Sequence, residues 1–325
     1  MRERDWSRLA SMCLRDPRKA FEAKLLELGK DNEAIVAISC DSASGGGLGA
    51  FFQAYPNRSV EVGISEQTAV GISAAMARQG FIPVVVAIDP FLTMRAYEQI
   101  RDDVGYMHTN VKLVASGGGL AYSTLGSTHM ALEDVALMRT VPNLVVLCPG
   151  DADEVEFCLE EAIKIDGPVF IRMPRQAKEP PAKRTQRKME LGRGEVLVDG
   201  GVAAALFTYG PSTAEAVEAA EILQEQGVSM SVINFTTLKP LDEELIRHYA
   251  SSAKKVFVLE EHAPNGGLGS AVADVLARSG ISVPLKVFCV PEGAKQTGPY
   301  EALLNYYGIS GSAVARRVMS VLSGD

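Results

Sequence analysis

Continuous apolar runs alternate with amphipathic segments along the whole chain. In the first half, the apolar runs lie at 34–39 (AIVAIS), 81–88 (FIPVVVAI), 111–116 (VKLVAS), 144–148 (LVVLC) and 168–172 (PVFIR). Such runs are typical of parallel strands that are buried on both faces. Helical periodicity between them predicts helices near 17–29, 66–79, 95–105, 131–138 and 151–164. This alternation predicts a parallel α/β sheet that binds ligands at the carboxyl ends of its strands.

The second half repeats the alternation after a break. The segment 173–188 (MPRQAKEPPAKRTQRK) is rich in proline and basic residues and has no apolar periodicity, as is typical of a linker. Beyond it, strands are predicted at 202–210, 228–235, 255–260 and 285–290, with helices near 212–226, 242–250 and 266–279. A length of 325 residues is also that of about two domains. We therefore expect two consecutive α/β domains, at 1–175 and 191–325, joined by a linker at 176–190.

Composition excludes several classes of function. The net charge of −8 argues against a nucleic-acid surface, which needs clustered basic residues. No apolar run reaches the length of a membrane helix, and the first residues lack the apolar core of a signal peptide. The five cysteines are scattered and odd in number, without CxxC spacing. They indicate reduced thiols in the cytoplasm and predict neither disulfides nor a metal site on this chain.

The stretch 59–80 (SVEVGISEQTAVGISAAMARQG) contains the first candidate for chemistry. It predicts a short strand, a turn at Gly63 and a helix that Ser65 is placed to cap. Glu66 lies in the first turn of that helix, where a negative charge favours the positive end of the helix dipole. The glycine-rich loop at 40–52 lacks the spacing of a dinucleotide-binding fingerprint. From spacing alone, Glu66 is interpreted as a helix-start charge.

Four longer strings together resemble the transketolase family. They are VGISEQTAVGISAAMARQG, RAYEQIRDDV, THMALEDVALMRTVPNLVVLCPGDADE and EEHAPNGGLGSAVADVLA. The resemblance covers nearly the whole chain and corresponds to the last two domains of the family. It implies a pyrimidine-binding domain followed by the transketolase C-terminal domain, with thiamine diphosphate and Mg²⁺ as cofactors.

The resemblance also implies roles for individual residues. Glu66 matches the glutamate whose carboxyl activates the coenzyme's aminopyrimidine, and it needs burial to raise its pKa above the ordinary value. Phe91 matches the aromatic platform for that ring, while Arg95 and Asp41 match residues that line the cofactor site. His129 matches a histidine that faces the substrate. Without the resemblance, these residues are interpreted as a helix-start charge, a core aromatic, a surface arginine, a loop cap and a structural histidine.

The resemblance implies half of an active site. The family holds the diphosphate through Mg²⁺ with a GDG…N motif in its first domain, and this chain has no GDG string. We expect a partner (alpha) subunit that carries this motif, with two copies of each chain. The implied reaction is ylide attack on a ketose donor, cleavage next to the carbonyl and transfer of a two-carbon ketol unit to an aldehyde acceptor.

Two alternatives to this function remain open on the sequence. One is the beta subunit of the decarboxylating component of a 2-oxo acid dehydrogenase, although that group lacks the THM-ALEDVALMR string. The other is a non-catalytic partner that only completes an oligomer. Retention of Glu66 and Phe91 counts against the second alternative.

The acceptor is expected to differ from an ordinary sugar phosphate. The segment 114–129 aligns with the family string that ends in DG-x-THQ. A phosphate-binding histidine of that string is Gly117 here, a hydroxyl-binding aspartate is Leu125, and the glutamine after His129 is Met130. These changes predict a less polar, modified or carrier-borne aldehyde. The alternative is that arginines such as Arg172, or the partner chain, supply the missing contacts.

Overall fold

A seven-stranded sheet forms the centre of the first domain. Its order is β10-β5-β6-β4-β3-β1-β2, and every pair is parallel except β10–β5. The strands are β1 (Ile35–Ser39), β2 (Ser59–Glu61), β3 (Ile82–Ile88), β4 (Lys112–Ser116), β5 (Val145–Leu147), β6 (Val169–Met173) and β10 (Thr237–Lys239). All residues of β1, β4 and β6 are buried, as the continuous apolar runs predict.

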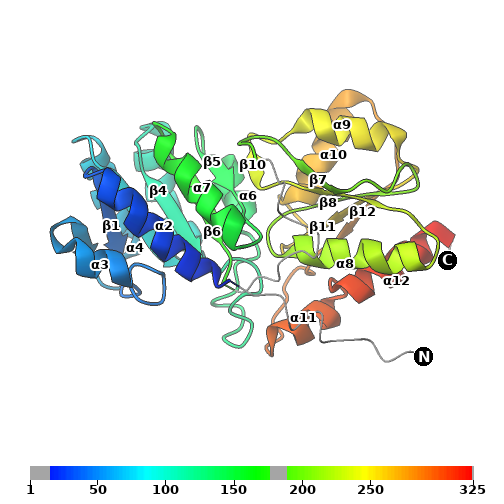
Figure 1. Cartoon of the computed structure of the whole chain (residues 1–325), viewed down its shortest axis with the longest axis horizontal. Helices are drawn as coiled ribbons and strands as arrows, with labels where there is room; N and C mark the ends of the chain where they lie inside the picture. Colours follow the sequence, from blue (N-terminus) through cyan, green and yellow to red (C-terminus); the bar gives the residue numbers. More distant parts are fainter. Residues whose placement is uncertain (1–14, 176–188, 324–325) are drawn as a thin grey trace.

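Helices cover both faces of this sheet. The helices α2 (Pro17–Asp31) and α7 (Ala152–Lys164) lie side by side over one face, as Figure 1 shows. The other face packs against α4 (Glu66–Ala77), the helical turns of residues 91–106 and α6 (Asp134–Thr140). A smaller helical segment, with α3 (Gly49–Ala54) and the turn η1 (Pro56–Arg58), follows β1 in the region predicted as a loop.

The second domain has a five-stranded sheet of order β12-β11-β8-β9-β7, in which only β7 is antiparallel. The strands are β7 (Glu195–Val198), β8 (Ala205–Thr208), β9 (Ser231–Asn234), β11 (Val256–Leu259) and β12 (Leu285–Phe288). Its helices are α8 (Ser212–Glu225), α9 (Glu243–Ser252), α10 (Leu268–Ser279), α11 (Tyr300–Tyr307) and α12 (Gly311–Ser323). The expected class of two consecutive α/β domains is confirmed, with sheets that are mixed and mainly parallel (Figure 1).

The computed structural model describes residues 15–175 and 189–323. Most of the expected linker at 176–190 therefore lies outside the described residues. The two domains are in contact across the strand β10, which follows β9 in the chain yet pairs with β5 of the first sheet. The Cys148 amide also donates to the Thr236 carbonyl across this junction. One apolar core runs through the junction, with Val146 and Leu238 among its buried residues.

Three local expectations differ from the structure near the candidate site. The predicted helix 95–105 begins earlier and is wound mainly as the π-turns η2 (Phe91–Arg95) and η3 (Ile100–Tyr106), with α5 (Tyr97–Gln99) between them. The predicted helix 131–138 begins only at Asp134, because Ala131 is extended and pairs with Gly119. Ser65 occupies the N-cap of α4, but its hydroxyl bonds Thr68 Oγ1 at 2.6 Å and makes no capping bond to the backbone.

None of the described helices has both the length and the apolarity to cross a membrane.

Candidate active site

Glu66 is a buried carboxylate at the first position of α4. The chain reaches it from β2 through Gly63, whose φ of +70° lies in the left-handed region that glycine tolerates. Only 2% of Glu66 is exposed. Its Oε2 accepts a hydrogen bond from Arg95 NH1 at 2.8 Å, and among the described residues Arg95 is the only side chain that bonds this carboxylate. A buried carboxylate with one partner has capacity for another donor.

Arg95 also stacks on an aromatic ring. Its guanidinium carbon lies 4.4 Å from the centroid of the Phe91 ring, at the other end of the same π-turn η2. A π-turn is wider than an α-helical turn and occurs frequently at functional sites. The flat guanidinium of Arg95 lies between the Phe91 ring and the Glu66 carboxylate. The Arg95 side chain is half exposed, so this contact lies at the surface of the domain. A planar cation is thus held by one stacking contact and one hydrogen bond.

His129 meets the same ring from another segment. Its imidazole packs edge-on against Phe91, with centroids 5.1 Å apart and an interplanar angle of 72°. The Thr128 hydroxyl lies 2.9 Å from His129 Nδ1 and orients the ring. Four of the residues singled out in the sequence therefore form one connected group, in the order Glu66, Arg95, Phe91 and His129. We call these four residues the Glu66–His129 group.

Asp41 lies beside this group without touching it in the described part of the chain. Its side chain is exposed, and its backbone has a φ of +55°. The Asp41 and Gly63 amides both donate to Glu61 Oε1, at 2.7 and 2.9 Å, which joins the end of β1 to the turn before α4. Burial, and after it the charges of Glu66 and Glu61, raises the pKa of the neighbouring Cys40 thiol to about 12. Asp41 therefore lies at the border of the candidate site, where its backbone amide is tied through Glu61 to the turn before α4.

The loop that carries His129 is shaped by glycine and tyrosine. Gly117 has a φ of +82°, and a side chain at this position would collide with the Tyr122 ring. Tyr122 also lies 6.1 Å from the His129 ring, centroid to centroid, and Arg175 stacks on it at 4.6 Å. Sequence reasoning singled out neither Tyr122 nor Arg175. The only signal was an arginine just after the predicted strand at 168–172.

Arg172 is enclosed beneath this loop. Its Nε and NH2 donate to the two carboxylate oxygens of Asp134, at 2.5 and 3.2 Å. NH2 also donates to the backbone oxygens of Ala131 and Glu261. Arg172 is 3% exposed and Asp134 is fully buried. The alternative in which Arg172 takes up a substrate phosphate is therefore wrong, because its guanidinium is already bound inside the protein.

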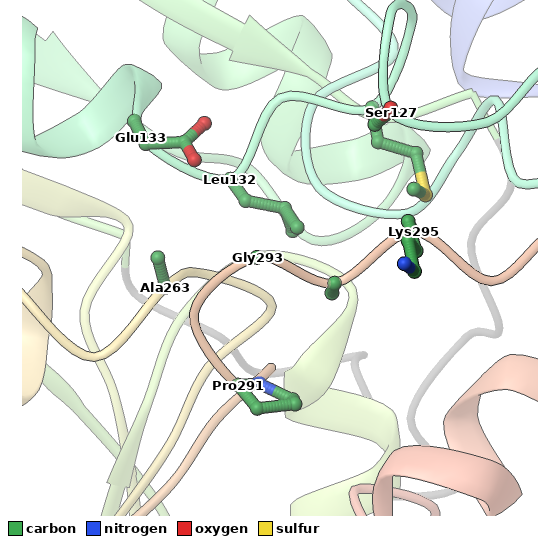
Figure 2. Close-up of a pocket in the computed structure, with 9 residues that line it drawn as sticks. Ser127, Leu132, Glu133, Ala263, Pro291, Gly293 and Lys295 are labelled. Carbon is green, nitrogen blue, oxygen red and sulfur yellow. The ribbon is translucent and has the colours of Figure 1, made fainter.

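A cavity of about 250 Å³ lies between the His129 loop and the second domain. In Figure 2, the Leu132 side chain extends from the loop at 126–133 towards the segment at 291–295, which Pro291 begins. Ser127 and Met130, on either side of Thr128 and His129, belong to its wall. Polar and apolar atoms both line the wall, and Glu133 and Lys295 are its charged residues.

The Glu66–His129 group has the chemistry to receive a flat, hydrogen-bonding ring. A buried carboxylate beside an aromatic face suits a flat heterocycle that can both stack and donate a hydrogen bond. Within residues 15–175 and 189–323, there is no cluster of three or more His, Cys, Asp or Glu side chains that could hold a metal ion.

Comparisons with known proteins agree with this fold. Two family models match the chain: "Transketolase, pyrimidine binding domain" over residues 15–180 and "Transketolase, C-terminal domain" over residues 192–314. A "Putative transketolase C-terminal section" from Methanocaldococcus jannaschii is 35% identical over 93% of this chain and 95% of that protein. An apulose-4-phosphate transketolase subunit from Phocaeicola vulgatus is 32% identical over 93% of this chain and 96% of that protein.

A solved structure and longer relatives show the same relationship. The structure titled "Split gene transketolase, inactive beta4 tetramer" matches with a TM-score of 0.84 and 35% identity, over 95% of this chain and 98% of that one. The chain spans about half the length of the 1-deoxy-D-xylulose-5-phosphate synthases that it also resembles.

The fold thus defines the pyrimidine-binding and C-terminal domains of the transketolase type. The chain belongs to the transketolase family, and it is a transketolase-like transferase of the kind divided between subunits.

Proposed function

We propose that this chain is the carboxy-terminal (beta) subunit of a split transketolase that transfers a two-carbon ketol unit from a ketose to an aldehyde. The observation that carries the proposal is the connected Glu66–His129 group, which joins a buried carboxylate, an aromatic face and a histidine. The assigned boundaries are a pyrimidine-binding domain at 1–175, a linker at 176–190 and a C-terminal domain at 191–325. Four cysteines that are free among the described residues fit the cytoplasm as the site of action.

Thiamine diphosphate, when bound, supplies the carbon nucleophile that accepts the ketol unit. Glu66 is assigned the hydrogen bond to the pyrimidine ring, and Phe91 is assigned the stacking face. In the free chain, Arg95 makes both of these contacts itself, one to Glu66 Oε2 and one to the Phe91 ring. Glu66 Oε1 remains available for a further donor, and Arg95, which is half exposed, is assigned to the wall of the cofactor site beside Phe91. Asp41 is assigned to the rim of the cofactor site.

His129 is assigned to the substrate side of the group. Its edge-on contact with Phe91 places the imidazole next to the assigned stacking face. A histidine there binds and orients substrate hydroxyls and can move a proton at its ring nitrogens. The Thr128 hydroxyl at Nδ1 favours one orientation of the ring.

The diphosphate and Mg²⁺ are assigned to a partner (alpha) subunit that carries the GDG…N motif. The absence of GDG from the sequence supports this division. Two similar proteins support it as well, since one is named as a subunit of a transketolase and the other as a split gene transketolase in an inactive tetramer. We assign two copies of each chain to the active complex.

Calorimetry on the separate and mixed chains tests this assignment. This chain alone should bind thiamine diphosphate weakly and be inactive, and addition of the partner should restore Mg²⁺-dependent binding and turnover. Tight Mg²⁺-dependent binding by this chain alone would refute the division of the site. Product analysis with ketose and 2-oxo acid donors decides between ketol transfer and the dehydrogenase alternative. If neither donor is used by the complex, the chain is an assembly partner only.

The acceptor is proposed to differ from a standard sugar phosphate. The reason is that the positions assigned to contacts with the acceptor's hydroxyl and phosphate groups are changed in this chain. Tyr122 fills the space that a histidine side chain at position 117 would need. Leu125, in place of a hydroxyl-binding aspartate, is 54% exposed and cannot accept a hydrogen bond. Arg172 is occupied by Asp134, so its guanidinium does not replace the missing phosphate contact.

Competition between acceptors tests this part of the proposal. We expect ribose 5-phosphate to be a poor acceptor for the complex, with less polar or carrier-borne aldehydes used better. Efficient use of ribose 5-phosphate, equal to that of a standard transketolase, would contradict it.

A further inference from the structure

Asp89 is a buried acid that the proposed function does not use. It follows β3 directly and is fully buried. The Thr93 hydroxyl donates to its backbone oxygen at 2.8 Å and lies 3.1 Å from Oδ1. Its Oδ2 has no hydrogen-bond partner within the described part of the chain. Burial of a carboxylate oxygen without a hydrogen-bond donor costs free energy. The protonation state of Asp89 therefore needs an explanation.

The carboxyl groups of Asp89 and Asp134 both lie close to the guanidinium of Arg172. Asp134 accepts two of the hydrogen bonds that Arg172 donates, while Asp89 Oδ2 borders the same small space as Arg172 Nε, next to Gly118. Gly118 lets the three groups approach, because an added Cβ would lie 2.9 Å from Asp89 Oδ2 and 2.5 Å from Arg172 Nε. One positive charge cannot balance two buried negative charges, so one carboxyl holds a proton.

The proton belongs to Asp89 on two grounds. Asp134 has both of its oxygens bonded to the guanidinium, which suits an ionised group. Burial first, and the charge of Asp134 second, raises the pKa of Asp89 well above its ordinary value. A hydrogen on Oδ2 would also provide the missing bond, because a protonated carboxyl donates where a carboxylate only accepts.

The three residues join the two segments that carry the candidate site. Asp89 is two residues before Phe91, at the base of η2. Asp134 begins α6, directly after the loop that carries His129. We propose that Asp89 is a neutral positioning residue, whose carboxyl hydrogen bond to Asp134 fixes the Phe91 segment against the His129 loop. Its relevance to turnover rests on the proposed function, but the bond itself does not.

Infrared spectroscopy on the intact chain tests the proton. The wild type should show the carbonyl stretch of a buried protonated carboxyl at neutral pH, and Asp89→Asn should lose it. Glu261→Gln is the matched control, because burial also raises the pKa of this second enclosed acid. The Asp89 band should persist in the control. An unchanged spectrum in Asp89→Asn would show that Asp89 is ionised, and the proposal would be wrong.

Crystal structures of two variants test the positioning role. Asp89→Asn retains an N–H donor towards Asp134 and should keep the Phe91 and His129 rings at their separation of 5.1 Å. Asp89→Leu has a similar size without a donor, leaves the Arg172–Asp134 pair balanced and should let the rings separate. Asp89→Ala, which also has no side-chain donor, serves the same purpose if the leucine variant does not fold. Rings that stay at 5.1 Å in the donor-less variant would overturn the role.

Turnover by the complex with the partner subunit gives a third measurement. Asp89→Leu should lower kcat by up to ~10²-fold, as small displacements of catalytic groups do, and Asp89→Asn should restore it. The infrared and crystallographic results need no activity, so they stand even if the proposed function fails. Equal turnover of all variants, in a complex that is active, would remove the catalytic relevance of the bond.

Discussion

The substitution Glu66→Gln separates a catalytic carboxyl from a helix-start charge. Glutamine has the same shape, and its amide oxygen can still accept the hydrogen bond that Arg95 gives at 2.8 Å. Only the charged part of the interaction is lost. Because Arg95 is 45% exposed, solvent screens this part, and exposed ion pairs contribute about 0.2–1 kcal/mol. The melting temperature of the chain should therefore fall by no more than about 4 °C.

Turnover should respond very differently. An amide cannot supply the proton that the assigned role of Glu66 requires, and such acid–base contributions are worth roughly 10²–10⁴-fold in rate. The assay compares kcat of the complex with the partner subunit, using a ketose donor, and thermal unfolding of the isolated chain. Glu98→Gln, an exposed acid on α5 close to Arg95, is the control for a change of charge alone. It should leave both quantities unchanged.

Two results would refute this reasoning. Wild-type turnover in Glu66→Gln would show that the carboxyl is only a helix-start charge. A melting temperature lowered far beyond the expected range would show that Glu66 mainly stabilises the fold, and the loss of rate would then have no catalytic meaning.

Three further predictions concern other parts of the molecule. Phe91→Leu removes an aromatic face whose stacking contributes about 0.5–1.5 kcal/mol. Calorimetry should therefore show coenzyme binding by the complex weakened up to tenfold, and an unchanged affinity would exclude the stacking role. Leu125→Asp should raise kcat/KM for ribose 5-phosphate by about tenfold or more, because a charge-assisted hydrogen bond contributes about 1.5–3 kcal/mol. An unchanged kcat/KM would show that position 125 does not take part in acceptor recognition. Burial lowers the pKa of Lys112 from 10.5 to about 7, so between these pH values the unfolded chain holds a proton that the folded chain lacks. The unfolding free energy should then rise with pH by up to about 1.4 kcal/mol per unit, and urea titrations of Lys112→Met should lack this rise.

The sequence by itself determined the fold class and the alternation of its main strands and helices along the chain. Runs such as 81–88 and 144–148 are apolar almost throughout, and such runs are typical of parallel strands that are covered on both faces. The family strings also identified Glu66, Phe91, Arg95 and His129 one at a time. What they could not provide was the contact of Glu66 with Arg95 or of Phe91 with His129, which lie far apart in the chain.

Only the tertiary structure decided how the site is assembled. The π-turn at 91–95 has no periodic pattern of its own, yet it places Arg95 over Phe91 and against Glu66. The strand β10 is three residues long, too short to give a period, although it joins the two domains. Arg172 is an available cation as far as the sequence shows, and its burial against Asp134 removes it from substrate binding. Packing determines which charges are enclosed, and a one-dimensional pattern does not contain that information.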